Sequence, residues 1–296
     1  NIQELIEKGA ETAAEKLRLE LYEKVNQLGI GAQGLGGLTT VLDIKVSEYA
    51  THAASLPVAI IPNCAATRHV HFTLDGSGPA KLEPPALSDW PDVTWKAAEN
   101  TRHVNLDTVS QADIEQWQPG ETLLLSGHLL TGRDAAHKRI ADLFANGESL
   151  PEGLDFTNRF IYYVGPVDPV KGEVVGPAGP TTATRMDKFT EMMLAKTGLL
   201  GMIGKAERGP TAIKAIQKHR SVYLIAVGGS AYLVSKAIKS AKMVAFEELG
   251  MEAVREFYIE NMPVTVAVDS LGDSVHKTGP IEWRQKIADI TISAKA

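Results

Sequence analysis

The chain has 296 residues, 44% of them hydrophobic, which is enough for about two domains that each bury a core. Its net charge of −6 excludes an overall basic field that would attract nucleic acid or an anionic membrane. The single cysteine excludes an internal disulfide framework and fits a reducing compartment, and the apolar runs are shorter than the ~20 residues of a membrane helix.

Residues 1–28 repeat apolar side chains at helical spacing, which predicts one long amphipathic helix that stops at Gly29. Strand-like segments then follow at Val41–Val46, Leu56–Ile61 and His69–Leu74. The helix has a broad apolar face and few partners in this stretch to cover it. We therefore expect residues 1–74 to be the end of a larger domain. Because the chain starts at Asn1 without a methionine, we expect a cut piece, or the mature end, of something longer.

Residues 75–100 hold several prolines and glycines without a periodic pattern, which predicts a linker before a second domain over residues 101–296. The predicted strands of that domain are Thr122–Ser126, Phe160–Val164, Val222–Val227 and Pro263–Val268, with a short mixed segment at Ala253–Ile259. The predicted helices are Ala135–Phe144, Thr182–Thr197, Gly209–Lys218 and a helix opened by Gly228 that runs through Ser240. Strands that alternate with helices predict an α/β layered domain.

The one cysteine, Cys64, ends a short apolar run that delivers its thiol into a turn. Free cysteine is among the most buried residue types, so an inert core thiol is one interpretation. The other is a ligand in a metal site completed elsewhere, since one thiolate alone holds no metal cluster. His52, His69 and His71 flank the run and favour this second interpretation.

Gly29, Gly31 and Gly34 match the spacing of the dinucleotide fingerprint. That fingerprint follows a strand and opens a helix, whereas this loop follows a helix and leads to a strand, so its context argues against a dinucleotide site. Two interpretations stay open. The loop is a helix-ending turn, or its bare amides approach a ligand closely.

Arg133 follows the buried strand Thr122–Ser126 and precedes a helix for which Asp134 is a plausible N-cap. The end of a strand is where α/β sheets bind ligands, and a guanidinium fork there suits a carboxylate. An ordinary ion pair with a nearby acid is the alternative.

Two Gly/Pro pairs between Gly176 and Pro180 predict a rigid loop that presents the hydroxyls of Thr181 and Thr182 where a helix begins. Arg185 comes four residues after Thr181, so both side chains can face one ligand. Helix capping is the alternative for the threonines. Lys205 follows an apolar turn that contains glycines. It either contacts a ligand or, as most lysines do, lies in solvent. Together the cations Arg133, Arg185 and Lys205 would form a pocket suited to a small dicarboxylate.

Five segments together resemble the iron–sulfur (class I) fumarases, and the resemblance to the bacterial cytosolic enzymes is close. The resemblance also extends to the two-subunit tartrate dehydratases. The segments are Gly31–Gly37, His52 through Cys64, Thr131–His137, Gly179–Asp187 and Met202–Lys205. The resemblance covers nearly the whole chain. It implies a cytoplasmic hydro-lyase that reversibly hydrates fumarate to L-malate, with a 4Fe–4S cluster whose open iron is the Lewis acid.

The same resemblance implies roles for individual residues. Cys64 matches one of three cluster cysteines, and Thr181 matches the proposed base. The matched substrate contacts are His52, Arg133, Arg185 and Lys205, with Thr182 beside them as a further substrate-binding residue.

The resemblance also implies an architecture. Residues 101–296 match a C-terminal swivelling β/β/α domain, and residues 1–74 match the end of a larger α-rich, cluster-binding N-terminal domain. The active site lies between these two domains, and the family members are dimers. The other two cluster cysteines and the general acid belong to N-terminal sequence that is largely absent here, so this chain alone is expected to be inactive. A tartrate or related hydroxy-acid dehydratase and a non-enzymatic fragment are the alternatives.

Overall fold

The computed structural model describes residues 1–63, 72–79, 101–170, 172–227 and 231–293. The chain divides into two compact units, one made of Asn1–Glu48 with Arg102–Ala296 and the other of Tyr49–Thr101. The described part of the second unit contains turns and bends but no helix or strand. The predicted strand Leu56–Ile61 is therefore wrong, because this segment has no partner strand among the described residues and its apolar side chains are exposed.

The N-terminal segment forms two helices, α1 (Ile2–Lys8) and α2 (Ala13–Gln27), where the sequence predicted one. The break has a local cause. Gly9 ends α1 at a φ of 84°, and Thr12 begins α2 with a capping box in which its hydroxyl accepts from the Glu15 amide at 3.2 Å. The apolar period continues across these signals, so the helical pattern alone did not reveal the break.

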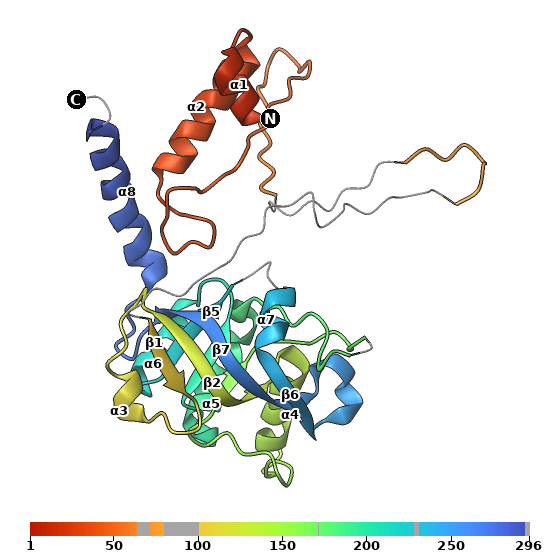
Figure 1. The fold of residues 1–296 in the computed structure, drawn as a ribbon, viewed down its shortest axis with the longest axis vertical. Helices are drawn as coiled ribbons and strands as arrows, with labels where there is room; N and C mark the ends of the chain where they lie inside the picture. Colours follow the sequence, from red (N-terminus) through yellow and green to blue (C-terminus); the bar gives the residue numbers. More distant parts are fainter. Residues whose placement is uncertain (64–71, 80–100, 171, 228–230, 294–296) are drawn as a thin grey trace. The chain divides into compact units, whose positions relative to one another are not determined.

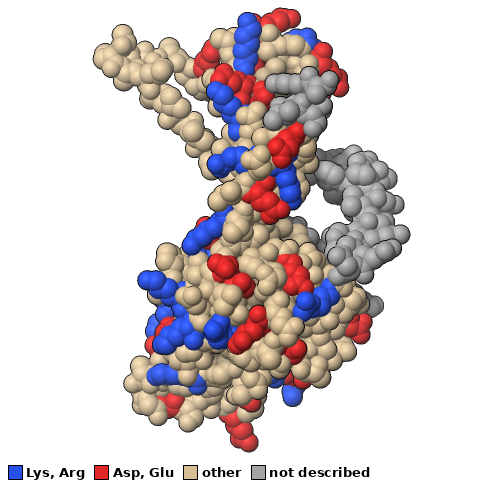
Figure 2. All heavy atoms as spheres, turned by 90° about the vertical axis from the view of Figure 1, so that its left-hand side faces the viewer, with Lys and Arg blue, Asp and Glu red and all other residues tan. Residues whose placement is uncertain are grey.

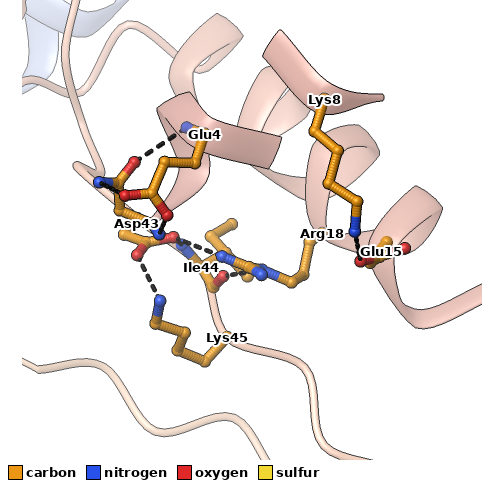
Figure 3. A network of polar contacts seen from close by, with 8 residues as sticks. Glu4, Lys8, Glu15, Arg18, Asp43, Ile44 and Lys45 are labelled. Carbon is orange, nitrogen blue, oxygen red and sulfur yellow. Dashed lines mark hydrogen bonds and ion pairs between the residues drawn. The ribbon is translucent and has the colours of Figure 1, made fainter. Parts of the chain in front are cut away.

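The segment 41–46 is irregular, so the strand predicted there is wrong. Side chains satisfy its backbone instead of a neighbouring strand. Arg18 on α2 donates to the Ile44 carbonyl oxygen at 2.6 Å and to Asp43 Oδ1 at 3.1 Å, and Lys45 pairs with the same carboxylate at 2.7 Å (Figure 3). The amide of Val41 donates to Asn26 Oδ1 at 3.0 Å.

The larger unit is built on a seven-stranded sheet (Figure 1). Its strands are β1 (Arg102–Asn105), β2 (Thr122–Thr131), β3 (Phe160–Tyr162), β4 (Gly201–Gly204), β5 (Val222–Ala226), β6 (Ile238–Ala245) and β7 (Val254–Val268). The helical elements around it are α3 (Gln111–Ile114), α4 (Asp134–Ala145), η2 (Ala183–Met186), α5 (Asp187–Thr197), α6 (Pro210–Lys218), α7 (Ala231–Ala237), η3 (Glu247–Glu252) and α8 (Val275–Ser293).

The sheet closes on itself because the 15-residue strand β7 pairs antiparallel with both β2 and β5. Thr265, for example, is the partner of Thr122 on one side and of Ile225 on the other. The parallel strands β2, β3, β4 and β5 complete the ring. We call this ring of five strands the barrel. The protein is thus a mixed α/β structure with a barrel-like sheet.

Alternation along the strands gives the barrel two apolar layers. One face of the strands forms a cluster that includes Leu125, Tyr162 and Leu224. The other face, with Ile161 and Tyr223, packs with residues of α4, α5 and α6 in a second cluster. These helices therefore cover the outer surface of the parallel strands. Their packing on the strands fixes the position of each helix's first turn.

Most predicted elements of residues 101–296 are confirmed, but four details are wrong. The helix expected to reach Ser240 ends at Ala237, where strand β6 begins. The two segments expected at 253–259 and 263–268 are the single strand β7, which continues through Asn261 at a φ of 52°. Asp134 is the first residue of α4 rather than its cap, and the residue at the cap position, Arg133, makes no side-chain capping bond. Helix α5 begins at Asp187, after the 3-10 turn η2.

Helix α8 was not predicted, and it is the longest described helix. None of the described helices is both long and apolar enough to cross a membrane. On the face drawn in Figure 2, acidic and basic side chains lie interspersed.

Candidate functional site

The parallel strands β2, β3 and β4 end at the same edge of the barrel. Thr131 is the register partner of Tyr162, and Tyr162 is the partner of Ile203. In α/β folds, both open sheets and closed barrels bind ligands beyond the carboxyl ends of their parallel strands. Arg133 leaves this edge after β2, and Lys205 leaves it after β4.

The loop that follows β3 brings Thr181 back to the same edge. The Thr181 amide donates to the Tyr163 carbonyl oxygen at 2.7 Å, and the Lys205 amide donates to the Thr181 carbonyl oxygen at 3.2 Å. The Ala183 amide then donates to the Lys205 carbonyl oxygen at 3.0 Å, so Thr182 and Lys205 form a parallel β-bridge. This bridge places the two threonines beside the lysine.

The side chains at this bridge are half-buried and have few protein partners. Thr182 makes no side-chain capping bond to η2, and neither threonine hydroxyl bonds to another described residue. The ammonium of Lys205 forms no ion pair within the part of the chain that the structure describes. Two hydroxyls and one cation are therefore available to a ligand at this edge.

Arg133 is held by an acid of η3. Its Nη2 lies 2.7 Å from Glu252 Oε1, and Oε2 of the same carboxylate accepts from the Ala135 amide at 2.7 Å. Burial would raise the pKa of Glu252, but the hydrogen bonds from Ala135 and Arg133 outweigh it and keep the pKa below its ordinary value. Arg133 thus forms the ion pair that was the alternative to ligand binding, with Glu252 as the acid. One donor of its guanidinium, Nε, is buried and has no hydrogen-bond partner among the described residues.

Arg185 also meets a carboxylate. Its Nη2 lies 3.0 Å from Oδ2 of Asp134, the residue after Arg133, and both side chains are about half exposed. The charge of Arg185 also contributes to the lowered pKa of Glu252. The structure therefore brings five of the predicted site residues to one edge of the barrel: Arg133, Thr181, Thr182, Arg185 and Lys205.

The two remaining predicted residues, His52 and Cys64, belong to the unit Tyr49–Thr101. His52 is exposed in the unit Tyr49–Thr101, where its Nδ1 accepts from the Ala54 amide at 3.2 Å. Cys64 lies outside the described residues, as do His69 and His71. Within the described ranges, no three His, Cys, Asp or Glu side chains gather in a way that could hold a metal ion.

The glycine-rich loop packs against the first turns of α8. A Cβ at Gly29 would lie 2.7 Å from the Arg284 nitrogen, and one at Gly36 would lie 2.6 Å from the Gly279 carbonyl oxygen. Both glycines have positive φ. Close backbone packing accounts for these two glycines, as the turn interpretation expects.

Sequence reasoning missed a buried ion pair beneath this edge. Arg208 is fully buried, and its Nε lies 2.6 Å from Oδ1 of Asp187. Its guanidinium carbon lies 4.9 Å from the Tyr223 ring centroid. The sequence gives no signal for it, because arginines are mostly exposed and the pair joins residues 21 positions apart.

Fold and side chains together define an α/β protein with a closed sheet whose parallel strand ends gather cationic side chains. The family model described as "Fumarase C-terminus" matches residues 76–279, and the model described as "Fumarate hydratase (Fumerase)" matches residues 2–73. The chain belongs to the fumarase family, which confirms the resemblance inferred from its motifs.

Individual relatives agree with this assignment. The chain is 34% identical over 265 residues to the aerobic class I fumarate hydratase of Escherichia coli K12, a match that covers 87% of this chain and 48% of that protein. It is 33% identical over 270 residues to fumarate hydratase 2 of Leishmania major, covering 88% and 46%. It therefore spans about half the length of these fumarate hydratases.

A shorter relative matches a little over half of the chain. A protein of Methanocaldococcus jannaschii assigned as L(+)-tartrate dehydratase subunit beta is 33% identical over 174 residues, which is 57% of this chain and 88% of that protein.

Proposed function

We propose that this chain forms part of a class I fumarate hydratase, a hydro-lyase that reversibly adds water to fumarate to give L-malate. The observation that supports this most is the grouping of Thr181, Thr182 and Lys205 at one strand edge, with Arg185 one turn further on. Fixed cations at such an edge suit a ligand with two carboxylates.

The cations have distinct parts in this proposal. Lys205 has no described acid to compete with a substrate carboxylate. The pair of Arg185 with Asp134 is about half exposed, and such pairs contribute only ~0–1 kcal/mol, so a substrate carboxylate can replace Asp134 at little cost. Arg133 is more buried and keeps Glu252, so it would offer its remaining donors to the substrate.

Removal of the C3 proton of malate puts negative charge onto the neighbouring carboxylate. Arg133, Arg185 and Lys205 would offset that charge best if water is excluded from the site. Thr181 is the proposed base. A hydroxyl is a poor base by itself, and the adjacent Lys205 would help because a nearby cation favours the deprotonated oxygen. Thr182 and His52 are proposed as further substrate contacts.

The 4Fe–4S cluster implied by the resemblance does not fit this chain alone. Such clusters are held by several cysteine thiolates, and the sequence contains one cysteine. The described residues add no grouping that could hold a metal. We therefore propose Cys64 as one ligand only, with the other cysteines and the general acid supplied by the rest of the enzyme.

A tartrate dehydratase is the second candidate function, favoured by the match to the tartrate dehydratase beta subunit of M. jannaschii. The cationic edge suits both substrates. Turnover of L-malate and of L(+)-tartrate by the complete, cluster-loaded enzyme separates the two, and we expect malate to be the better substrate. Turnover of neither compound would contradict both functions.

Replacing Lys205 with methionine in the complete enzyme should raise the KM for L-malate about tenfold to a hundredfold, the usual contribution of a hydrogen bond to a charged group. Steady-state kinetics on variants of equal iron content measures this. Lys218→Met is the matched control, because Lys218 lies at the end of α6 and pairs with Glu191. An unchanged KM in Lys205→Met would remove Lys205 from the substrate contacts.

We propose that residues 75–100 form a linker between a domain part at 1–74 and a second domain at 101–296. Limited proteolysis should cut between Asp75 and Pro91 and leave a stable fragment that starts at about residue 100, because exposed linkers are cut first. Mass spectrometry of the fragments locates the cuts. Preferred cleavage inside Thr122–Val227 would contradict this division.

The proposed assembly is a homodimer in the cytoplasm, as the resemblance implies. The single cysteine supports a reducing compartment.

A further inference from the structure

Two segments of the candidate site are fastened to each other along their length. One is 181–187, which carries Thr181 and Arg185, and the other is 205–209, which starts at Lys205. Besides the bond from Arg208, four hydrogen bonds join them. The Lys205 amide donates to the Thr181 carbonyl oxygen (3.2 Å), and the Ala183 amide donates to the Lys205 carbonyl oxygen (3.0 Å). The Thr184 hydroxyl donates to the Glu207 carbonyl oxygen (2.9 Å), and the Gly209 amide donates to Asp187 Oδ2 (2.7 Å). A shift of either segment would therefore disturb the other.

Arg208 is the buried member of this connection. Its Nε donates to Asp187 Oδ1 at 2.6 Å, and its Nη2 donates to the hydroxyl of Thr190, one turn further along α5. Its side chain is fully buried, over the ring of Tyr223. One guanidinium thus holds the start of α5 at two points while its own backbone belongs to the Lys205 segment.

Stability alone does not explain an arginine at this place. Apolar residues of similar volume are often as stable as a buried ion pair, or more stable, because both charges must leave water. An apolar pair lacks direction, however, whereas the planar guanidinium fixes the orientation of its carboxylate. Asp187 has both oxygens occupied, by Arg208 and by the Gly209 amide, and Arg185 lies two residues before it.

We propose that Arg208 is a positioning residue of the dicarboxylate site, which holds the turn that carries Arg185 in a fixed place against Lys205. The proposal rests on the proposed function, since it assigns a role to Arg208 in binding that substrate. A small displacement of binding groups is costly to an enzyme, because orientation supplies a large part of its rate and affinity.

The test is the double variant Arg208→Met/Asp187→Leu in the complete, cluster-loaded enzyme. It leaves no unpaired buried charge, so we expect it to fold. We expect the KM for L-malate to rise at least about tenfold while kcat falls less. We also expect the amides of Ala183 and Lys205, whose backbone acceptors are unchanged, to exchange hydrogen at least about tenfold faster, because their segments open more often.

The matched control is Arg159→Met/Glu256→Leu, which removes an ion pair of 2.6 Å next to the opposite end of β3. It should leave both the KM and the exchange at Ala183 and Lys205 unchanged. If the double variant at Arg208 does not fold, Arg208→Lys keeps the charge and loses the fork, and the same two measurements apply.

Each outcome decides the proposal. Faster exchange together with a raised KM supports it. Unchanged exchange, or faster exchange with an unchanged KM, overturns it. If the unaltered enzyme turns over no dicarboxylate, the proposed function fails and the role of Arg208 in substrate binding fails with it, while the exchange measurement still decides whether Arg208 fastens the two segments.

Discussion

Replacing Thr181 with alanine in the complete, cluster-loaded enzyme should lower kcat by about a hundredfold or more, the usual loss when a general base is removed. The KM should change little, because the role proposed for Thr181 is to take the C3 proton in the transition state and not to bind a carboxylate. Thr181→Ser should keep part of the rate, since the hydroxyl remains. Steady-state kinetics, with the iron content checked for each variant, measures the kcat and KM of Thr181→Ala and the remaining rate of Thr181→Ser.

Arg185→Ala provides the contrast. If Arg185 binds a carboxylate in both ground and transition states, its loss should raise the KM strongly, with some loss of kcat because charge grows during proton removal. The structure adds a second consequence, because the variant frees Asp134 from an ion pair and leaves a carboxylate near the substrate.

A Thr181→Ala enzyme with near-normal kcat would show that the base lies elsewhere.

The strands that could be predicted from the sequence are those buried on both faces. Val222–Ala226 is apolar throughout because each of its side chains enters one of the two apolar layers of the barrel. β6 could not be predicted this way. It pairs on one side only, and most of its side chains are exposed, so its sequence carries no apolar pattern.

Strand β7 shows a different limit. Asn261 and Pro263 normally interrupt a strand, and the sequence therefore suggested two segments. In the structure the strand continues through both, because β2 pairs with it from Glu256 to Thr265. On its other edge, residues 254–259 pair with β6 and residues 264–268 pair with β5. Pairing with strands that are distant in sequence therefore determines that β7 is one continuous strand, and local propensity does not.

The candidate site divides in the same way. The position of Arg133 at a strand end follows from an apolar run and a helix start, which are local signals. Its acid, Glu252, is 119 residues away, and the bridge between Thr182 and Lys205 joins two separate loops. Nothing in the spacing of these residues indicates either contact. The sequence motifs identify the candidate site residues, and the closed sheet determines which of these residues contact one another.

His137 should make the stability of the protein depend on pH. It is fully buried on α4 beside Arg133, and its Nδ1 lies 2.8 Å from the Arg133 carbonyl oxygen. The groups that face it are the rings of Tyr163 and Phe189 and, at longer range, the charges of Arg208 and Asp134. Burial lowers the pKa of His137 from its ordinary 6.5 to about 4, so the folded protein keeps the ring neutral.

The sign of the effect follows from proton binding. Between pH 6.5 and about 4 the unfolded chain binds a proton at His137 that the folded protein does not. The free energy of unfolding should therefore fall as the pH is lowered through this window, by on the order of 3 kcal/mol from this group at pH 4 and below. Above pH 6.5 both states are neutral, and the group adds no pH dependence.

Denaturant unfolding of the full chain at pH 7, 5.5 and 4 measures this, with His137→Asn as the test variant. The asparagine amide keeps a donor for the Arg133 carbonyl oxygen and does not titrate, so the variant should lose this part of the pH dependence. Ile140→Ala is the matched control, because Ile140 is fully buried one turn along α4 and its loss lowers stability without removing a titrating group. It should keep the slope of the unaltered protein. Equal slopes for His137→Asn and the unaltered protein would mean that His137 is protonated in the folded state, and the neutral ring inferred from its burial would be wrong.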